Sequence, residues 1–110
     1  MIKITHNTER DGTECRHTIT IKGHAGYAPI GEDIVCAGVS TLAYTLIARL
    51  EDLKAWEFKH KDSKTDGMTI SCVTTDHDED IKEAIRFAMQ GFTLLQDHYH
   101  KKYVQVTEKG

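Results

Sequence analysis

The chain has 110 residues, of which 39% are hydrophobic and 28% charged, the composition of one globular domain rather than of a disordered segment. Its formal net charge of -3 lacks the positive excess usual in nucleic-acid-binding proteins, so we expect no direct nucleic-acid partner. Three cysteines without a Cys-x-x-Cys pair argue against a disulfide framework and a zinc ribbon. We expect neither a signal peptide nor a membrane span, because the first residues alternate like a strand and no apolar run approaches about 20 residues. A cytoplasmic protein with free thiols is therefore predicted.

A hairpin of two strands is predicted at the start of the chain. Residues 2–6 alternate between apolar and polar side chains, and residues 17–21 do so again. The polar stretch 7–12 between them ends in Asp11-Gly12, a dipeptide typical of hairpin turns. The two segments should therefore pair as antiparallel strands.

A broad apolar helix is predicted next. Residues 25–35 are expected to form an exposed, mobile loop, in which Pro29 excludes a helix. Beyond the loop, apolar residues recur at helical spacing up to Leu53, and hardly any charge interrupts them. So wide an apolar surface favours a helix that packs on a sheet and also on a second subunit.

The second half of the chain repeats the order strand, strand, helix and adds a last strand. The predicted segments are strands at 56–60 and 68–73, an amphipathic helix at 81–99, a strand at 103–106 and a frayed tail at 107–110. Asp76 or Asp78 can cap that helix. The predicted fold class is α+β in the order ββαββαβ, one domain over 1–110, with two helices on one face of a mainly antiparallel sheet.

One cysteine and one histidine have the surroundings that nucleophilic catalysis needs. Cys36 falls at the start of the predicted helix, where the helix dipole and free backbone N–H groups favour a thiolate. His24 follows the second strand, twelve residues earlier, and an imidazole there can act as general base. The alternatives are a small buried cysteine and a structural histidine. Cys15 and Cys72 have no such setting, and we expect Cys72 to point into the core.

Four neighbours of the thiol are candidate supporting residues. The backbone N–H groups of Ala37 and Gly38 could hold an oxyanion, since the amides of a first helical turn lack partners within the helix. Asp33 could orient the imidazole as the third member of a triad, or it could cap the helix. Ser40 shares the helix face of the thiol, one turn further along. No residue pattern predicts a metal or another cofactor.

The two motifs Gly23-His24-Ala25 and Asp33-Ile34-Val35-Cys36-Ala37-Gly38-Val39-Ser40, at their spacing, resemble the ribosomal-processing cysteine proteases of the Prp family. The resemblance extends over the whole chain in length and element order. It implies that His24 and Cys36 form a catalytic dyad and that Asp33 and Ser40 support it. It also implies a homodimer and a mobile loop that orders around substrate. The substrate-loop residues are then Gly26, Tyr27, Pro29, Ile30 and Gly31.

The resemblance further implies a substrate. Members of this family remove a short N-terminal extension from large-subunit ribosomal protein twenty-seven, cutting after an aromatic-rich motif. Two alternatives stay open on the residues alone: a related phage enzyme that trims capsid or scaffold proteins, and a ribosome-associated module that binds a peptide without cutting it.

Overall fold

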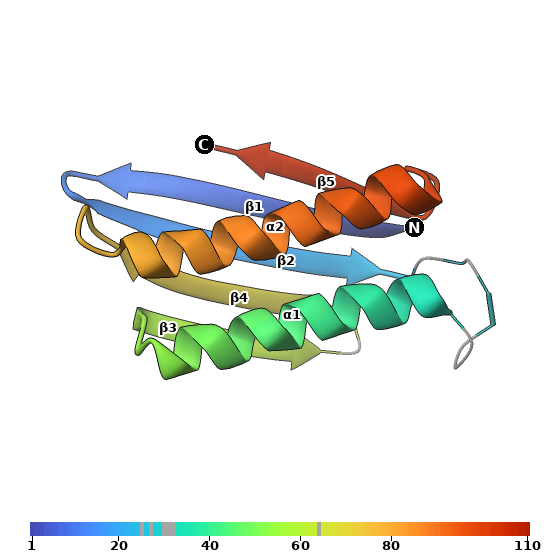
Figure 1. The fold of residues 1–110 in the computed structure, drawn as a ribbon, viewed down its shortest axis with the longest axis horizontal. Coiled ribbons are helices and arrows are strands. Elements are labelled where there is room, and N and C mark those ends of the chain that lie inside the picture. Colours follow the sequence, from blue (N-terminus) through green and yellow to red (C-terminus); the bar gives the residue numbers. More distant parts are fainter. Residues whose placement is uncertain (25, 27, 30–32, 64) are drawn as a thin grey trace.

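Seven elements follow one another in the predicted order ββαββαβ, and the fold class is confirmed (Figure 1). The computed structural model describes residues 1–110 except 25, 27, 30–32 and 64. The elements are β1 (Ile2–Asp11), β2 (Glu14–Gly23), α1 (Ile34–Asp52), β3 (Trp56–Ser63), β4 (Gly67–Thr74), α2 (Glu79–Tyr99) and β5 (Val104–Lys109).

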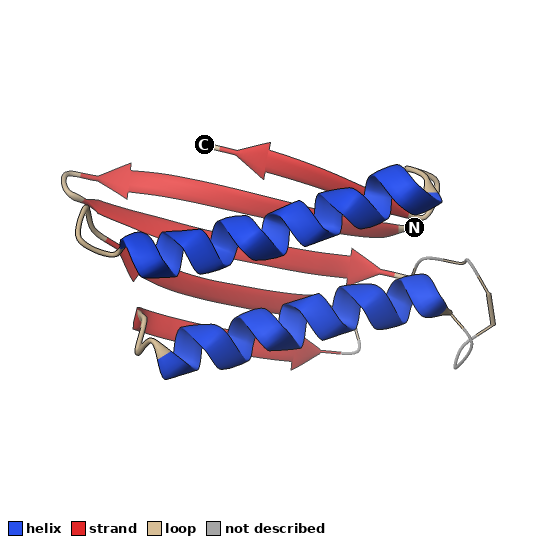
Figure 2. Cartoon of the chain, viewed as in Figure 1, coloured by secondary structure: helices blue, strands red, loops and turns tan. Residues whose placement is uncertain are grey.

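The five strands form one sheet in the order β3-β4-β2-β1-β5. All neighbouring pairs are antiparallel except β1 and β5, which are parallel. Both helices lie on the same face of this sheet (Figure 2). No helix of the described chain covers the other face of the sheet.

The strands extend further than the sequence pattern predicts. β2 spans Glu14–Gly23 rather than 17–21, and β3 continues to Ser63 rather than ending at 60. β1 continues to Asp11 through most of the polar stretch assigned to the connection, because residues 7–11 all pair with β2. Gly12, at a φ of +63°, then makes the tight turn. The predicted frayed tail is wrong as well, since Thr107 pairs with Thr5 and Lys109 with Asn7 in the parallel β1–β5 ladder.

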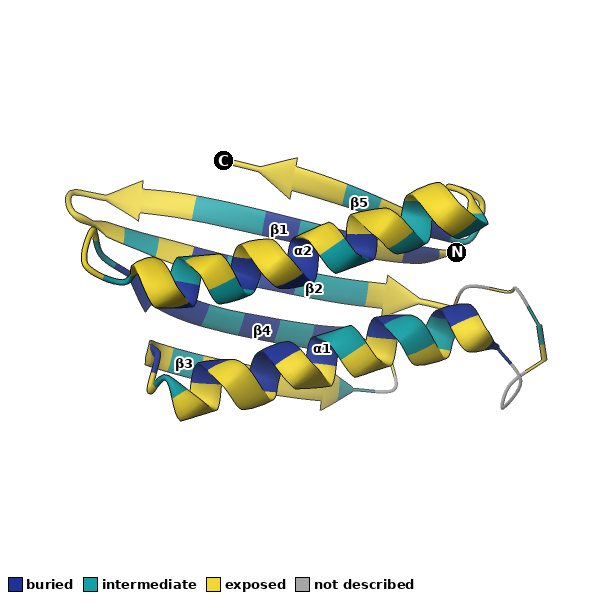
Figure 3. Ribbon diagram, viewed as in Figure 1, coloured by how far each residue is buried: buried dark blue, intermediate teal, exposed yellow. Residues whose placement is uncertain are grey.

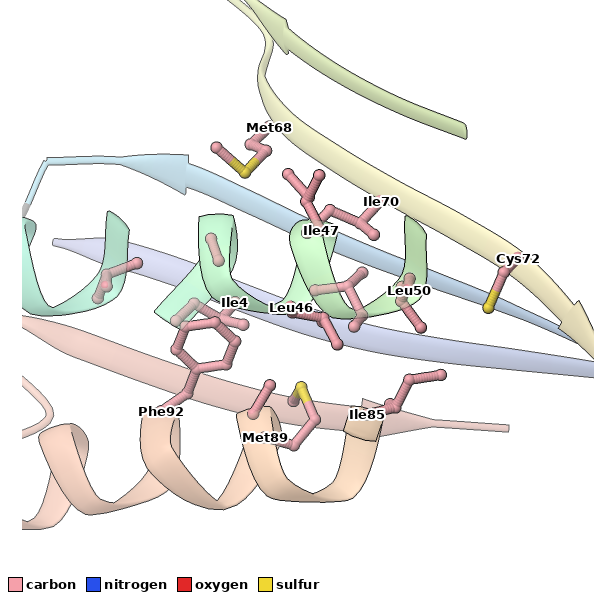
Figure 4. Close-up of a cluster of buried hydrophobic side chains, with 14 of the residues drawn as sticks. Ile4, Leu46, Ile47, Leu50, Met68, Ile70, Cys72, Ile85, Met89 and Phe92 are labelled. Atoms are coloured by element: carbon pink, nitrogen blue, oxygen red, sulfur yellow. The ribbon is translucent and has the colours of Figure 1, made fainter. Parts of the chain in front are cut away.

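The core fills the space between the helices and the sheet. Buried positions alternate along β1, β2 and β4, and both helices turn their buried side toward the strands (Figure 3). Phe92 and Met89 of α2 meet Leu46 of α1 over Ile4 and Ile70 of the sheet (Figure 4). Cys72 belongs to this cluster and is 1% exposed, as predicted.

Helix α1 is more continuously apolar than the sequence reading allowed, which found no apolar run of about 20 residues. By length and composition it could cross a membrane, because its 19 residues include a window with a mean hydropathy of 1.4. In the structure, its buried side chains, which include Val35, Val39 and Leu50, belong to the domain core. Packing against a sheet requires an apolar helix surface, so these core contacts account for apolar residues of α1.

Helix α2 begins differently from the prediction. Asp78 is the residue before its first turn, but its side chain makes no hydrogen bond to the helix. The Asp78 carboxylate instead accepts hydrogen bonds from the backbone N–H and the hydroxyl of Thr75, at 2.7 and 3.1 Å. The side chain therefore stabilises the turn that leads into α2 rather than the helix end.

Candidate active site

A cavity of about 430 Å³ opens at the N-terminal end of α1. Its walls come from the end of β2, the first turns of α1 and the β3–β4 turn. His24 and Cys36 both line it, so the fold brings these two predicted residues to one cleft. We name this cavity the catalytic cleft after the two candidate catalytic residues that line it.

The end of β2 fixes the position of His24. Gly23, the last residue of β2, has a φ of +93°, a conformation that side chains with a Cβ rarely adopt. A Cβ built on Gly23 would lie 2.3 Å from the carbonyl oxygen of Met1. Only glycine therefore lets the chain pass this close to the N-terminus before it presents His24, which is exposed, at the cleft.

Asp33 positions Cys36 by capping α1. The buried Asp33 carboxylate accepts hydrogen bonds from the backbone N–H groups of Val35 and Cys36, each at 3.0 Å. This arrangement is that of an N-cap, which satisfies amides that have no partner within the helix. Of the two roles considered for Asp33, the structure contains the cap.

The candidate oxyanion donors do not fit this arrangement. The Ala37 N–H donates to the Asp33 carbonyl oxygen at 3.1 Å and is therefore occupied. Gly38 lies on the other side of the helix, where a Cβ would meet Leu95 at 3.3 Å. The Gly38 N–H lies within the helix, where the regular pattern bonds it to the carbonyl four residues earlier. Both amides therefore already have acceptors while α1 keeps this geometry.

One face of α1 forms a wall of the catalytic cleft. Cys36, Ser40 and Tyr44 follow each other at intervals of four residues, and all three line the cavity. The Tyr44 hydroxyl donates a hydrogen bond of 2.5 Å to the Asp62 carboxylate, which raises the pKa of Tyr44. Sequence reasoning missed this pair. The spacing from Cys36 could have indicated Tyr44, but Asp62 arrives through the pairing of β3 with β4.

The predicted substrate loop is described only in part. Gly26 and Pro29 are exposed, and Gly26 has a φ of +70°. Tyr27, Ile30 and Gly31 lie outside the described residues. The predicted contact of this loop with substrate therefore stays a prediction.

The remaining cysteines differ from Cys36 in their surroundings. Burial raises the pKa of the Cys72 thiol to about 11, with a smaller contribution from Asp78. A thiol that ionises so late is a poor nucleophile near neutral pH. Cys15 is partly buried and does not line the catalytic cleft. Among the described residues, no three His, Cys, Asp or Glu side chains converge on a point that could hold a metal ion.

Comparison with known families identifies the chain's relatives. The family model for cysteine protease Prp matches residues 1–105. This chain belongs to the Prp cysteine protease family. No curated protein sequence matches it.

Solved structures share the fold over nearly the whole chain. The essential ribosomal processing protease Prp from S. aureus, with a covalently linked product peptide, is 20% identical, with a TM-score of 0.78 over 99% of this chain and 100% of that one. The same S. aureus protease with a substrate peptide is 17% identical, with a TM-score of 0.70 and the same coverage. SMU.848 from Streptococcus mutans is 27% identical, with a TM-score of 0.73 over 100% of this chain and 96% of that one.

Proposed function

We propose that this Prp-family protein is an endopeptidase in which Cys36 is the nucleophile and His24 the general base. The observation that carries the proposal is the catalytic cleft itself, which two residues from separate elements line together. Cys36 lies in the first turn of α1, where the positive end of the helix dipole favours a thiolate. Cys15 and Cys72 lack this setting.

The chemical steps follow from these roles. His24 takes the proton of the Cys36 thiol, and the thiolate attacks the scissile carbonyl. The peptide C–N bond then breaks, the imidazolium of His24 protonates the leaving amine, and the acyl group remains on Cys36 as a thioester. Water, deprotonated by His24, hydrolyses the thioester and restores the thiol. Asp33 keeps Cys36 at the helix end throughout, through its hydrogen bonds to the first turn.

We infer that the substrate is the short N-terminal extension of large-subunit ribosomal protein twenty-seven, cleaved in the cytoplasm. Family membership supports this, and so do the relatives from S. aureus, whose structures hold a substrate peptide and a product peptide. The shape of the cleft is also suitable. Cys36 and Tyr44 are eight helical residues apart, about 12 Å along the axis, which is the length of roughly four residues of extended peptide.

The test is cleavage of a peptide that spans the extension junction, followed by mass spectrometry. Wild-type protein is expected to make a single cut, and Cys36→Ala and His24→Ala to make none. Cys15→Ala is the matched control, because it removes a thiol outside the cleft, and it should cleave like the wild type. Cleavage by Cys36→Ala at the wild-type rate would refute the assignment.

We further propose that the protein is a homodimer joined through the outer side of its helices. A groove of about 500 Å³ runs between α1 and α2, where Phe87 is 72% exposed. Arg49 lines it together with Asp80 and Glu83. In a twofold interface the same patch faces itself, so Arg49 of each subunit would meet the carboxylates of the other. Leu94, 61% exposed, extends the apolar surface along α2.

Light scattering after size-exclusion chromatography tests the dimer. The wild type should have twice the mass of the chain, and Phe87→Glu should have the mass of one chain. Trp56→Glu is the control, since Trp56 is also an exposed aromatic residue, at 53%, but belongs to β3. A wild-type protein of single-chain mass at micromolar concentration would contradict the proposed interface.

A further inference from the structure

The uncovered face of the sheet has an unusual composition. Side chains alternate along each strand, so those that do not point toward the helices point to this face. The ladder register places them in rows that run across the five strands. Two neighbouring rows, written from β3 to β5, are Lys61, Thr69, Thr20, Thr5, Thr107 and Lys59, Ser71, Thr18, Asn7, Lys109.

A further row lies toward the N-terminal end of β1. There Lys3 pairs with Lys22 across the β1–β2 ladder, and Gln105 of β5 lies beside Lys3. These three rows together contain five lysines, a centre of hydroxyl and amide side chains, and no acidic residue. We call this surface the lysine face.

The lysines of this face are exposed and have no acidic partner among the described residues. No carboxylate of the described chain lies within ion-pair distance of any of the five. The first acidic residues on this side of the sheet are Glu9 of β1 and Glu57 of β3, beyond these rows, where Arg16 of β2 forms an ion pair with Glu57 at 3.3 Å and lies beside Glu9 in the β1–β2 ladder. The acidic residues of the helices lie on the opposite side of the domain, for example Glu51 of α1 and Glu83 of α2.

We propose that the lysine face binds the sugar–phosphate backbone of structured RNA. Lysines without acidic partners attract phosphates, and binding releases the counterions of the nucleic acid. Threonine, serine and asparagine between them can donate hydrogen bonds to phosphate oxygens and both donate to and accept from the 2′-hydroxyl. The surface is a sheet face without aromatic side chains in these rows, so it suits a backbone rather than stacked single-stranded bases.

The charge distribution explains why composition alone argued against this partner. The net charge of -3 sums over the whole chain, whereas the register gathers lysines from four strands on one side of the sheet. The choice of RNA rests on the proposed function, because a protease of ribosomal proteins works beside ribosomal RNA. The surface would then hold the enzyme near its substrate, with the catalytic cleft free, since only Lys22 of the five lines that cleft.

Fluorescence anisotropy with a labelled RNA hairpin of about 20 base pairs tests the proposal. The test variant is Lys59→Gln/Lys61→Gln, which leaves the catalytic cleft untouched. The control is Lys101→Gln/Lys102→Gln, which removes the same charge from the exposed turn between α2 and β5. We expect the wild type and the control to bind alike. The test variant should bind at least tenfold more weakly at about 100 mM salt, with a slope of log affinity against log salt smaller by about 2.

Three results would overturn the proposal. The wild type could fail to bind the hairpin at about 50 mM salt, or the test and control variants could lose binding equally. The wild type could also bind a DNA hairpin of the same sequence more tightly than the RNA hairpin. Circular dichroism melting of each variant shows whether it folds. Peptide cleavage, measured separately, reports on the proposed protease function and does not depend on RNA binding.

Discussion

A chain of hydrogen bonds that includes two buried histidines should make this protein sensitive to mild acid. His6 lies between Glu108 and His17, with nitrogen–oxygen and nitrogen–nitrogen distances of 3.0 Å, and His17 in turn contacts the Thr74 hydroxyl at 2.8 Å. Burial, the neighbouring His6 and the charge of Lys82 lower the pKa of His17 from 6.5 to about 4. The folded protein therefore holds His17 neutral over a pH range in which the unfolded chain protonates it.

The sign and the size of the effect follow from proton linkage. Between pH 6.5 and about 4 the unfolded state binds the proton and the folded state does not, so the free energy of unfolding falls as the pH falls. At about 1.4 kcal/mol per pH unit, the loss reaches roughly 3 kcal/mol over the full range and about 2 kcal/mol by pH 5. That is a large part of the 5–15 kcal/mol by which domains are typically stable.

Urea unfolding followed by circular dichroism at several pH values between about 7.5 and 5 measures this loss. In His17→Gln the His17 contribution to the pH dependence should disappear, whatever the absolute stability of the variant. His77→Gln, which changes an exposed histidine, should keep the wild-type dependence. The reasoning is refuted if the wild type shows no loss by pH 5, or if His17→Gln loses as much stability as the wild type does.

Three further predictions concern the catalytic cleft and its supports. Asp33→Ala should lower the free energy of unfolding by about 1 kcal/mol, as loss of an N-cap does, and Asp33→Asn should recover most of it in urea titrations. Iodoacetamide at neutral pH should label Cys36 and leave Cys72 unlabelled in the folded protein, because burial raises the pKa of Cys72 to about 11; peptide mapping would detect the opposite order. Gly23→Ala should unfold at lower temperature and cleave more slowly, since its Cβ would collide with Met1; an unchanged melting temperature would contradict this.

The spacing of apolar residues predicted the order and type of the helices and strands, because this spacing involves only residues close to each other in the sequence. The apolar spacing from Ile81 to Tyr99 lies within α2 as the structure has it. The same patterns failed for the polar end of β1 and for the C-terminal tail. Those residues are strand because their backbones pair with β2 and β1 respectively, and backbone pairing between polar residues leaves no mark on local hydrophobic alternation.

The candidate site was predictable only where it depends on one element. Helical spacing predicts that Cys36 and Ser40 share one face of α1. Aspartate is a preferred N-cap residue, so the sequence also indicated the capping role of Asp33. Asp62 and the lysine face depend on the strand order β3-β4-β2-β1-β5, which brings β3 near α1 and sets the rows across the sheet. No spacing in the sequence encodes that order, since β2 pairs with β4 across α1 and β3.

The measurement that tests the central claim most directly is the intact mass of the protein during turnover. Protein mixed with the extension-junction peptide and quenched in acid should carry the acyl group of the N-terminal fragment, and peptide mapping should locate it on Cys36. Cys36→Ala should carry no such adduct. Peptide cleavage without any acyl-enzyme on rapid quenching, or an adduct located on Cys15 or Cys72, would contradict the account of Cys36 as the nucleophile.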